Sequence, residues 1–521
     1  MQTFHVPPNS GERYPKPKYR TDSNPAYRGN LLVEAIPDVP DHDSAYAALA
    51  YQPPQRGANF RSDPPHRKLD LVLELDRVFV PTEQHIQALQ LIVAVVRECY
   101  SYRNPNDPKV QNALYVGLKM GSIGLSRLSP TGGGSIGLVL WGVTGVGKTS
   151  FVDRLCDYLG TQPIFHQEIQ GRPCLWPQLP IVRIQCKNSL KGTIAALISE
   201  IDSKLHTTHG SGLGGKINRD MHVTKVANVL KLHFVGLLIV EDVQKLKDSE
   251  HDVLEYFCDL MEEGGFPVLL VANYKFRGTL TSDGSLLSKL TGKALIDFEP
   301  ISFVEHGEVV EASGESNFTS VDDSDEWTPM VEELWNLNVF SKPRPMPRDL
   351  PRWLHFHTEG IRRIARQMMA AIFVRALHHG SEDGEELEVT ENLLDDIASK
   401  ELLKYQPAIE HLRKRKRGDP ITDAEALLFE SYFLPESDRH ELRKGIERRN
   451  AEARRQGGPK KAAAKTAAEK PPTDKQASPP RKRAPRKIAA THNKPAPQTE
   501  SAADVYARLV KEGKVFRHDR R

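Results

Sequence analysis

The sequence predicts an α/β fold built on a parallel sheet, and two observations support this. Between residues 136 and 376, the apolar runs IGLVLWG, PIVRIQC, GLLIVED and PVLLVAN alternate with segments of helical periodicity. Such alternation is typical of βα units, in which helices cover a parallel sheet. The second observation is the segment GVTGVGKTS, which follows the first apolar run and opens a helical segment. A phosphate-binding loop needs this placement between a strand and a helix.

Composition limits the class of protein. The chain has 521 residues, enough for two or three domains, and a net charge of +3 from 71 Lys/Arg and 68 Asp/Glu. Residues 451–521 hold 19 Lys/Arg and 7 Asp/Glu, so this tail carries +12 and the remainder −9. The five cysteines form no C-x-x-C pair, which argues against a disulfide framework and a zinc site. No apolar run approaches the roughly 20 residues of a membrane span, so we expect a cytoplasmic protein without a membrane partner.

Composition and periodicity also divide the chain into parts. The beginning is rich in Pro, Asn, Asp and Tyr with little periodicity, the segment GEVVEASGESNFTSVDDSDEW has few apolar residues, and the composition after residue 449 is low in large apolar residues. The predicted parts are an extended N-terminal docking arm at 1–66, N-terminal helices and the α/β core at 67–300, an acidic insertion at 301–326, a helical lid and C-terminal helices at 327–449, a disordered basic linker at 450–500 and a short tethered interaction helix at 501–521.

The segment GVTGVGKTS matches the P-loop pattern G-x-x-x-x-G-K-[ST]. Its glycines let backbone N–H groups turn toward phosphates, Lys148 reaches the outer phosphates, and the Thr149 hydroxyl can ligate Mg²⁺. The pattern therefore predicts ATP and Mg²⁺ as cofactors. The predicted nucleotide-binding residues are Gly142, Val143, Thr144, Gly145, Val146, Gly147, Lys148, Thr149 and Ser150.

The run LLIVED predicts a second strand that delivers two acids at its tip. We expect Glu241 to organise the metal together with Thr149, and Asp242 to act as the general base on water. ATPases usually have Asp-Glu in this place, and the shorter Asp242 reaches less far, so the reversed order predicts slow hydrolysis. An alternative register makes Asp242 the metal acid and leaves Gln244 near the water.

Further candidates lie downstream. Asn273 ends the strand PVLLVAN, where many ATPases place a residue that senses the γ-phosphate; the alternative is an Asn that caps a turn. Together with Lys148 and Asp242 it completes the predicted catalytic set. In GIRRIARQ, either Arg362 or Arg363 is a candidate for contact with nucleotide from the lid, and a solvated helix face is the alternative.

These motifs and their order resemble the AAA+ ATPases, and the flanking phrases resemble the TnsC-like (TniB/TnsC) regulators of Tn-seven-type DNA transposons. The phrases are NPAYRGNLLVEAIP, YRNPNDPKVQ, VRIQCKNSLKGTIAALISEID and EWTPMVEELWNLNVF, and the resemblance covers most of residues 24–400. It implies an AAA+ P-loop fold with a helical lid, and an ATPase that assembles on double-stranded DNA as a ring or an open helix in the bacterial nucleoid. It also implies a target-selector protein bound at the N-terminal region and transposase subunits bound by the C-terminal tail.

The resemblance implies further site residues. The loop CKNSLKG is similar to the family loop that follows DNA; it holds Lys187, Asn188, Ser189 and Lys191, with helix capping by Ser189 as the alternative. Family arginines that act across a subunit boundary fall near SLLSKLTGKAL, where this chain has only Lys289 and Lys293. Two other functions remain open: a helicase loader or replication initiator of the AAA+ class, and a nucleotide-binding scaffold without a role on DNA.

Overall fold

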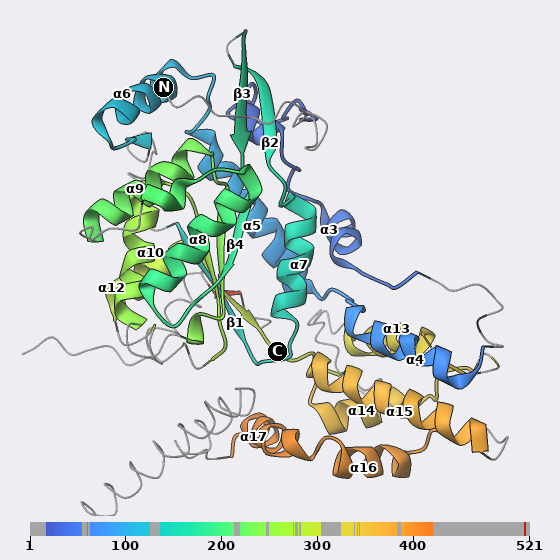
Figure 1. The fold of residues 1–521 in the computed structure, drawn as a ribbon. Coiled ribbons are helices and arrows are strands. Elements are labelled where there is room, and N and C mark those ends of the chain that lie inside the picture. The colour runs from blue at the N-terminus through green and yellow to red at the C-terminus, as the bar shows by residue number, and fades with distance from the viewer. Residues whose placement is uncertain are drawn as a thin grey trace, which may run out of the picture.

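The computed structural model has an α/β core and a smaller helical lid (Figure 1). The structure describes residues 17–54, 60, 63–125, 136–169, 171–212, 219–245, 250–274, 276, 280, 283–303, 325–337, 339–340, 342, 344–382, 387–419 and 515–516. Residues 304–324 of the predicted acidic insertion and all of the predicted linker at 450–500 lie outside these ranges.

The core is built on a parallel sheet with the strand order β4-β5-β6-β1-β7-β8. These strands are β1 (Gly137–Gly142), β4 (Ile181–Gln185), β5 (Leu237–Glu241), β6 (Val268–Val271), β7 (Ala294–Phe298) and β8 (Val515–Phe516). Every residue of β1, β5, β6 and β7 is buried. Strands buried on both faces are continuous apolar runs, as the sequence has them. The predicted α/β class with a parallel sheet is confirmed.

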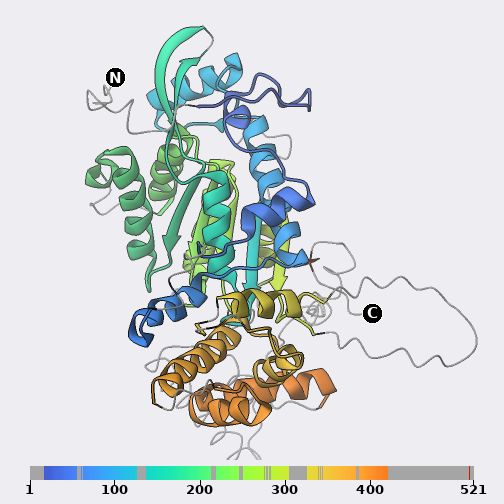
Figure 2. The same cartoon turned by 90° about the vertical axis from the view of Figure 1, so that its right-hand side faces the viewer.

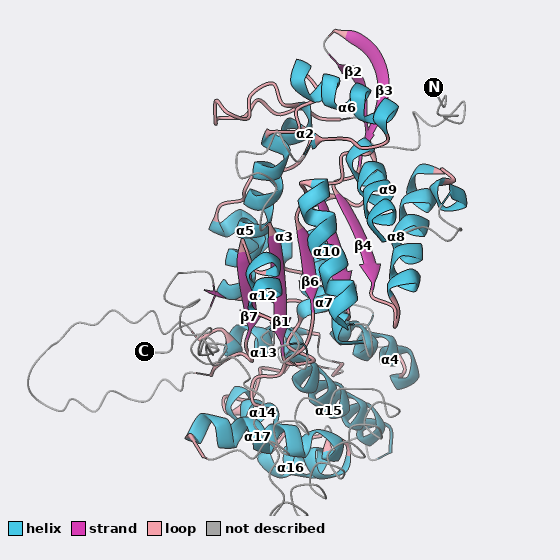
Figure 3. Cartoon of the chain, turned by 90° about the vertical axis from the view of Figure 1, so that its left-hand side faces the viewer, coloured by secondary structure: helices cyan, strands magenta, loops and turns pink. Residues whose placement is uncertain are grey.

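Helices cover both faces of the sheet (Figure 1). On one face lie α5 (Glu83–Ser101) and α7 (Lys148–Leu159), and on the other α9 (Arg219–Leu232), α10 (Glu250–Gly264) and α12 (Gly284–Leu290). Next to the edge strand β4 packs α8 (Leu190–Leu205), which leads into a short 3-10 helix (His209–Gly212). At the end of the core opposite the lid lie α6 (Pro108–Met120) and the antiparallel hairpin of β2 (Ile164–Ile169) and β3 (Arg172–Gln178) (Figure 3).

The lid has an apolar core of its own, separate from that of the sheet. Its helices are α4 (Pro65–Glu74) with the 3-10 helix Leu75–Arg77, α13 (Trp327–Asn336), α14 (Leu350–Thr358), α15 (Arg362–Glu382), α16 (Glu391–Lys400), the 3-10 helix Leu403–Tyr405 and α17 (Gln406–Arg417) (Figure 2). The sequence prediction counted residues 67–77 with the α/β core. Instead, Leu71, Val72 and Leu75 are buried in the lid core, because α4 packs against α15.

Residues 17–54 fold onto the core of their own chain. This segment contains α2 (Leu31–Glu34) and α3 (His42–Leu49), and its side chains Leu32, Val33 and Leu49 are completely buried in the sheet-domain core. Asn30 caps α2 and also donates from Nδ2 to the Tyr100 carbonyl oxygen of α5 at 2.8 Å. The prediction of an extended arm is therefore wrong for these residues. Short helices with few apolar side chains show little periodicity, although several of these side chains are buried.

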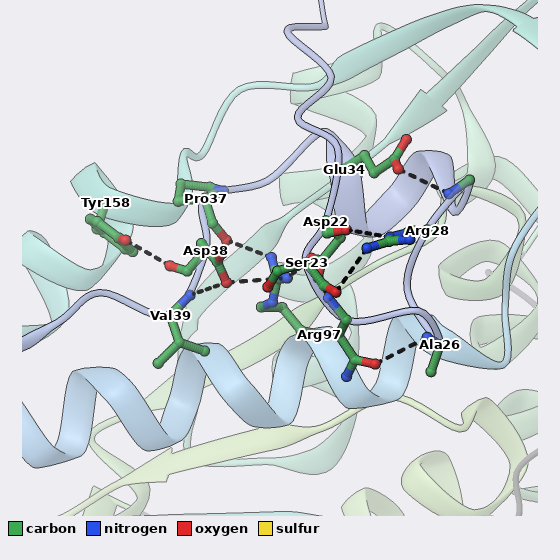
Figure 4. Close-up of polar contacts among 12 residues, drawn as sticks. Asp22, Ser23, Ala26, Arg28, Glu34, Pro37, Asp38, Val39, Arg97 and Tyr158 are labelled. Atoms are coloured by element: carbon green, nitrogen blue, oxygen red, sulfur yellow. Dashed lines mark hydrogen bonds and ion pairs between the residues drawn. The ribbon is translucent and has the colours of Figure 1, made fainter.

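An ion pair fixes this segment to α5 (Figure 4). The Arg97 guanidinium pairs with the Asp22 carboxylate, and their side chains are 4% and 5% exposed. Arg97 also lies 3.2 Å from an Asp38 carboxylate oxygen and donates to the Pro37 carbonyl oxygen at 3.2 Å. One buried cation thus holds both ends of α2 in place.

The C-terminal tail contributes one strand. Within the described residues, Val515–Phe516 pairs in parallel with Leu295 and Ile296 of β7. The sequence predicted a helix for residues 501–521, so these two residues differ from the prediction, and the rest of that segment lies outside the described residues. A strand that covers a sheet edge satisfies backbone groups that β7 would otherwise leave unpaired.

In the part of the chain that the structure describes, no helix combines the length and the apolar character that crossing a membrane requires.

The Asp22–Arg97 pair gives a prediction about stability. Asp22→Asn removes the buried carboxylate and leaves Arg97 only the exposed Asp38, so we expect a loss on the order of 3 kcal/mol in the free energy of unfolding. Urea denaturation measures this loss, and limited proteolysis near residues 17–54 should become faster. Asp43→Asn is the control, because the Asp43 side chain is fully exposed. Equal stability of the two variants would contradict the structural role of the pair.

Candidate nucleotide-binding site

The segment GVTGVGKTS forms a tight loop between β1 and α7, as predicted. The strand ends at Gly142 and the helix begins at Lys148. Gly142 and Gly145 have φ values of +151° and +93°, which side chains rarely allow. A Cβ at Gly142 would lie 2.4 Å from the Phe298 carbonyl oxygen, and one at Gly145 would lie 2.9 Å from Cβ of Arg363. Both positions therefore require glycine.

The ammonium group of Lys148 lies inside this loop. Its Nζ donates to the carbonyl oxygens of Gly142 at 2.7 Å and Val143 at 3.0 Å. Burial lowers the pKa of Lys148 to about 7, although the charges of Asp297 and Asp242 act in the opposite direction. Val143 and Val146 are buried beneath the loop, whereas Thr149 is exposed at the start of α7.

The two acids at the tip of β5 lie in different environments. Glu241 accepts from Nε of Arg183 at 2.7 Å, and Nη1 of the same arginine pairs with Asp153 of α7 at 2.6 Å. The Glu241 side chain is only 8% exposed. Because β5 and β4 are paired, Arg183 and Glu241 stand on the same face of the sheet. In this structure, Glu241 is held by an arginine that the sequence analysis did not consider.

Asp242 follows in a left-handed conformation, with φ of +59°, outside the end of the strand. This conformation is uncommon for residues other than glycine and occurs often at functional sites. Its carboxylate accepts from Nε2 of Gln244, in the 3-10 helix Val243–Lys245, at 3.1 Å. Oε1 of Gln244 in turn accepts from the Asn273 backbone N–H at 3.4 Å. The structure thus connects Asp242, Gln244 and Asn273 in one chain of hydrogen bonds.

Asp297 is a buried acid near the loop that the sequence analysis missed. It lies on β7 opposite Trp141, accepts from the Tyr274 hydroxyl at 2.6 Å, and opposes the lowered pKa of Lys148. A single acid within the apolar run ALIDF was the available signal, because an acid in a buried strand needs a partner.

The start of α15 brings two lid arginines onto the loop. The Arg363 backbone N–H donates to the Gly145 carbonyl oxygen at 3.0 Å. The Arg362 side chain passes Gly147 so closely that a Cβ there would lie 3.3 Å from its Cδ. Of the two candidates, Arg362 is the buried one, at 1% exposure, whereas Arg363 is exposed.

The Arg362 guanidinium is only partly satisfied by the protein. Nη1 donates to the Val80 carbonyl oxygen at 2.6 Å, and the group stacks over the Phe79 ring at 5.2 Å. Among the described residues, Nε and Nη2 find no hydrogen-bond partner. Burial, followed by the charge of Arg366, lowers the pKa of Arg362 to about 9. A buried cation with two unsatisfied donors beside a P-loop fits a bound phosphate.

The loop that was predicted to contact DNA lies between β4 and α8. Lys187, Asn188, Ser189 and Lys191 come together there at the start of α8. All four side chains are exposed. Oγ of Ser189 accepts from the Gly192 backbone N–H at 3.2 Å, so Ser189 caps the helix, as the alternative interpretation had it.

The two lysines considered for contact across a subunit boundary are engaged within the chain. Lys289 pairs with Glu262 at 2.7 Å, and Lys293 pairs with Glu98 at 2.6 Å. Both pairs are partly exposed, so their energies are small and a change of partner costs little.

Comparison with known proteins agrees with this geometry. Residues 134–280 match the family described as "AAA domain". This part of the chain is therefore similar to the AAA domains. The match includes the P-loop, the acids at the tip of β5 and Asn273. This match confirms the predicted AAA+ P-loop core. A separate comparison with curated proteins found no match to the chain.

Three solved structures are similar to the chain at low identity. Domain III of the Thermotoga maritima replication initiation protein DnaA is 15% identical, covers 56% of this chain and 92% of its own, and has a TM-score of 0.29. The Aeropyrum pernix ORC1 protein in complex with DNA is 12% identical, with coverages of 69% and 83% and a TM-score of 0.31. A point variant of Thermotoga maritima RuvB is 12% identical, with coverages of 62% and 83% and a TM-score of 0.28.

Proposed function

We propose that this chain is an ATP-dependent, DNA-binding AAA+ regulator of DNA transposition, which oligomerises on target DNA and links a target-selector protein to the transposase. One observation carries the nucleotide part: the lid places a buried, half-satisfied Arg362 beside a P-loop that contains Lys148. The resemblance of the flanking phrases to the TnsC-like regulators supports the transposition part.

The residues fit ATP and Mg²⁺. Two donors of Arg362 are left for phosphate oxygens, and Gly145 and Gly147 leave no side chain between the loop and the lid. Lys148 would hold the outer phosphates, and the exposed Thr149 hydroxyl would ligate the metal. When bound, ATP would supply the γ-phosphoryl group that is transferred to water, and Mg²⁺ would neutralise charge on the phosphate oxygens.

The geometry supports the register in which Asp242 is the metal acid. Asp242 interacts with the charge of Lys148, whereas Glu241 is held by Arg183. Gln244 and Asn273, which are connected through a hydrogen bond, would then orient the attacking water. In the other register Glu241 organises the metal and Asp242 is the base, which requires Glu241 to leave Arg183. Because an amide orients water without accepting its proton, the proposed arrangement hydrolyses ATP slowly, as suits a switch that persists on DNA.

DNA contact is assigned to the loop after β4. Lys187 and Lys191 are exposed at a strand-to-helix junction, where they would meet phosphates without reading bases. The target-selector protein is assigned to the N-terminal region, and transposase subunits to the C-terminal tail. Because residues 17–54 are folded onto the core, the selector would meet their outer surface rather than an extended arm.

Lys148→Ala should abolish ATP binding, because it removes the cation that holds the outer phosphates. Titration with a fluorescent ATP analogue measures this.

In the wild type, the affinity for ATP should be constant below pH 7 and fall above it, since Lys148 with a pKa of about 7 must then take up a proton to bind phosphate. The decrease is at most about tenfold per pH unit. Wild-type affinity in Lys148→Ala, or a flat profile in the wild type up to pH 9, would contradict these roles.

The two registers predict different effects of the two acids on the rate of ATP hydrolysis. If Asp242 is the metal acid, Asp242→Asn should lower ATP hydrolysis by about 10²-fold or more, while Glu241→Gln, which keeps an acceptor for Arg183, should lower it less than about tenfold. Steady-state phosphate release measures both variants, and analogue binding shows that the fold is intact. The reverse order of effects would return the metal role to Glu241.

DNA binding should need ATP, tolerate any sequence and weaken with salt. Reversing the charges of Lys187 and Lys191 to Glu should lower affinity alike on unrelated duplexes and reduce the log–log salt slope by about 2. Lys109→Glu with Lys119→Glu is the control, because both residues are exposed on α6 and the net charge changes equally. An equal loss in the control would show that only net charge matters.

A further inference from the structure

The end of α17 carries the longest uninterrupted run of basic residues in the chain, RKRKR at 413–417. The functional site described above does not use it. Cations are favourable in the last turn of a helix, where the backbone carbonyl groups point outward. Five adjacent like charges nevertheless repel one another and need counter-charges.

One carboxylate is shared between two of these cations. Nε of Arg413 lies 3.1 Å from Oε1 of Glu359, and Nζ of Lys416 lies 2.5 Å from its Oε2. Arg417 pairs separately with Glu410 at 3.4 Å and Asp419 at 2.9 Å. Glu359 thus offsets two positive charges with a single negative one, whereas Arg417 has two carboxylates of its own.

The carboxylate lies below the cations. The Glu359 side chain is 9% exposed, whereas Lys416 and Arg417 are 31% and 55% exposed. Arg413 also stacks over the ring of Phe356 at 4.4 Å and donates to its carbonyl oxygen. Lys416 and Arg417 therefore face outward, whereas Arg413, at 22% exposure, contacts both the buried Glu359 and the exposed ring of Phe356.

We propose that the end of α17 binds the phosphodiester backbone of duplex DNA, and that Glu359 is the intramolecular competitor for two of its cations. The inference rests on the proposed DNA-binding function and adds a contact surface in the lid to the loop after β4. Arginine and lysine side chains bind phosphate oxygens by charge-assisted hydrogen bonds, without reading sequence. A carboxylate already bound to the same cations must be displaced, so it lowers the affinity for DNA.

This competition predicts that removal of a carboxylate, without any added cation, increases the affinity for DNA. Glu359→Gln adds no cation, yet it should tighten DNA binding severalfold at low salt and steepen the log–log salt slope by about 1 to 2, since two cations become available for phosphates. Arg417→Gln should do the opposite, with weaker binding and a slope shallower by about 1. Fluorescence anisotropy with ATP and two unrelated duplexes, over a range of salt concentrations, measures both variants.

The matched control is Glu401→Gln. Glu401 lies in the same lid and accepts from Arg375 on α15, so its substitution changes the net charge equally without releasing a cation of α17. We expect wild-type affinity from this control. Thermal unfolding shows whether each variant is folded, and Arg417→Gln keeps the test valid if Glu359→Gln is not, because Arg417 makes no pair with Glu359.

The outcomes separate this inference from the proposed function. If the wild type binds no duplex, both are overturned. If the Lys187 and Lys191 variants weaken binding while folded Glu359→Gln and Arg417→Gln bind as the wild type does, only the α17 surface is overturned. The surface is also overturned if Glu359→Gln tightens binding of polyglutamate and leaves duplex affinity unchanged, because the partner would then be an acidic protein.

Discussion

The contact between the P-loop and the start of α15 is the constraint on which the rest of the structure depends. The sheet domain and the lid have separate apolar cores, and the hydrogen bond from the Arg363 backbone to the Gly145 carbonyl oxygen joins them at the P-loop. This approach is possible only because Gly145 and Gly147 lack side chains. The glycines of a P-loop are usually explained by phosphate alone; here they also allow the lid to reach the loop.

The same contact places Arg362 in an unfavourable environment. A buried guanidinium whose nitrogens Nε and Nη2 have no hydrogen-bond partner lowers the stability of the observed lid position, and its depressed pKa reflects this cost. A bound phosphate would give both nitrogens an acceptor and so stabilise this position, whereas a lid without anion would move away more easily. Bound nucleotide would then act on the lid through a single side chain, whose guanidinium lies over the Phe79 ring.

The sequence predicted the parts that follow from local patterns. GVTGVGKTS, the acids of LLIVED and the strand shortly before Asn273 can be recognised because each combines a short motif with a buried strand. Arg183 and Asp297 could not be assigned, because their roles come from strands that are distant in sequence and paired in the sheet. Residues 17–54 were misjudged for a related reason: a few buried side chains and the Asp22–Arg97 pair fix them, and neither gives a periodic signal.

The lid connects the two proposed ligands through one turn. Glu359, held by Arg413 and Lys416, is in a left-handed conformation at the end of α14, and Arg362 follows three residues later. Between them, the Gly360 carbonyl oxygen accepts from Ile301, which ties the turn to the end of the sheet domain. A ligand that takes Arg413 and Lys416 from Glu359 removes a restraint on the turn that carries Arg362. Because binding free energies are linked, any effect of DNA on nucleotide affinity must be matched by an equal effect of nucleotide on DNA affinity. The turn at 359–362 thus joins the carboxylate that holds two cations of α17 to the arginine beside the P-loop, so it is the place where such an effect would be transmitted.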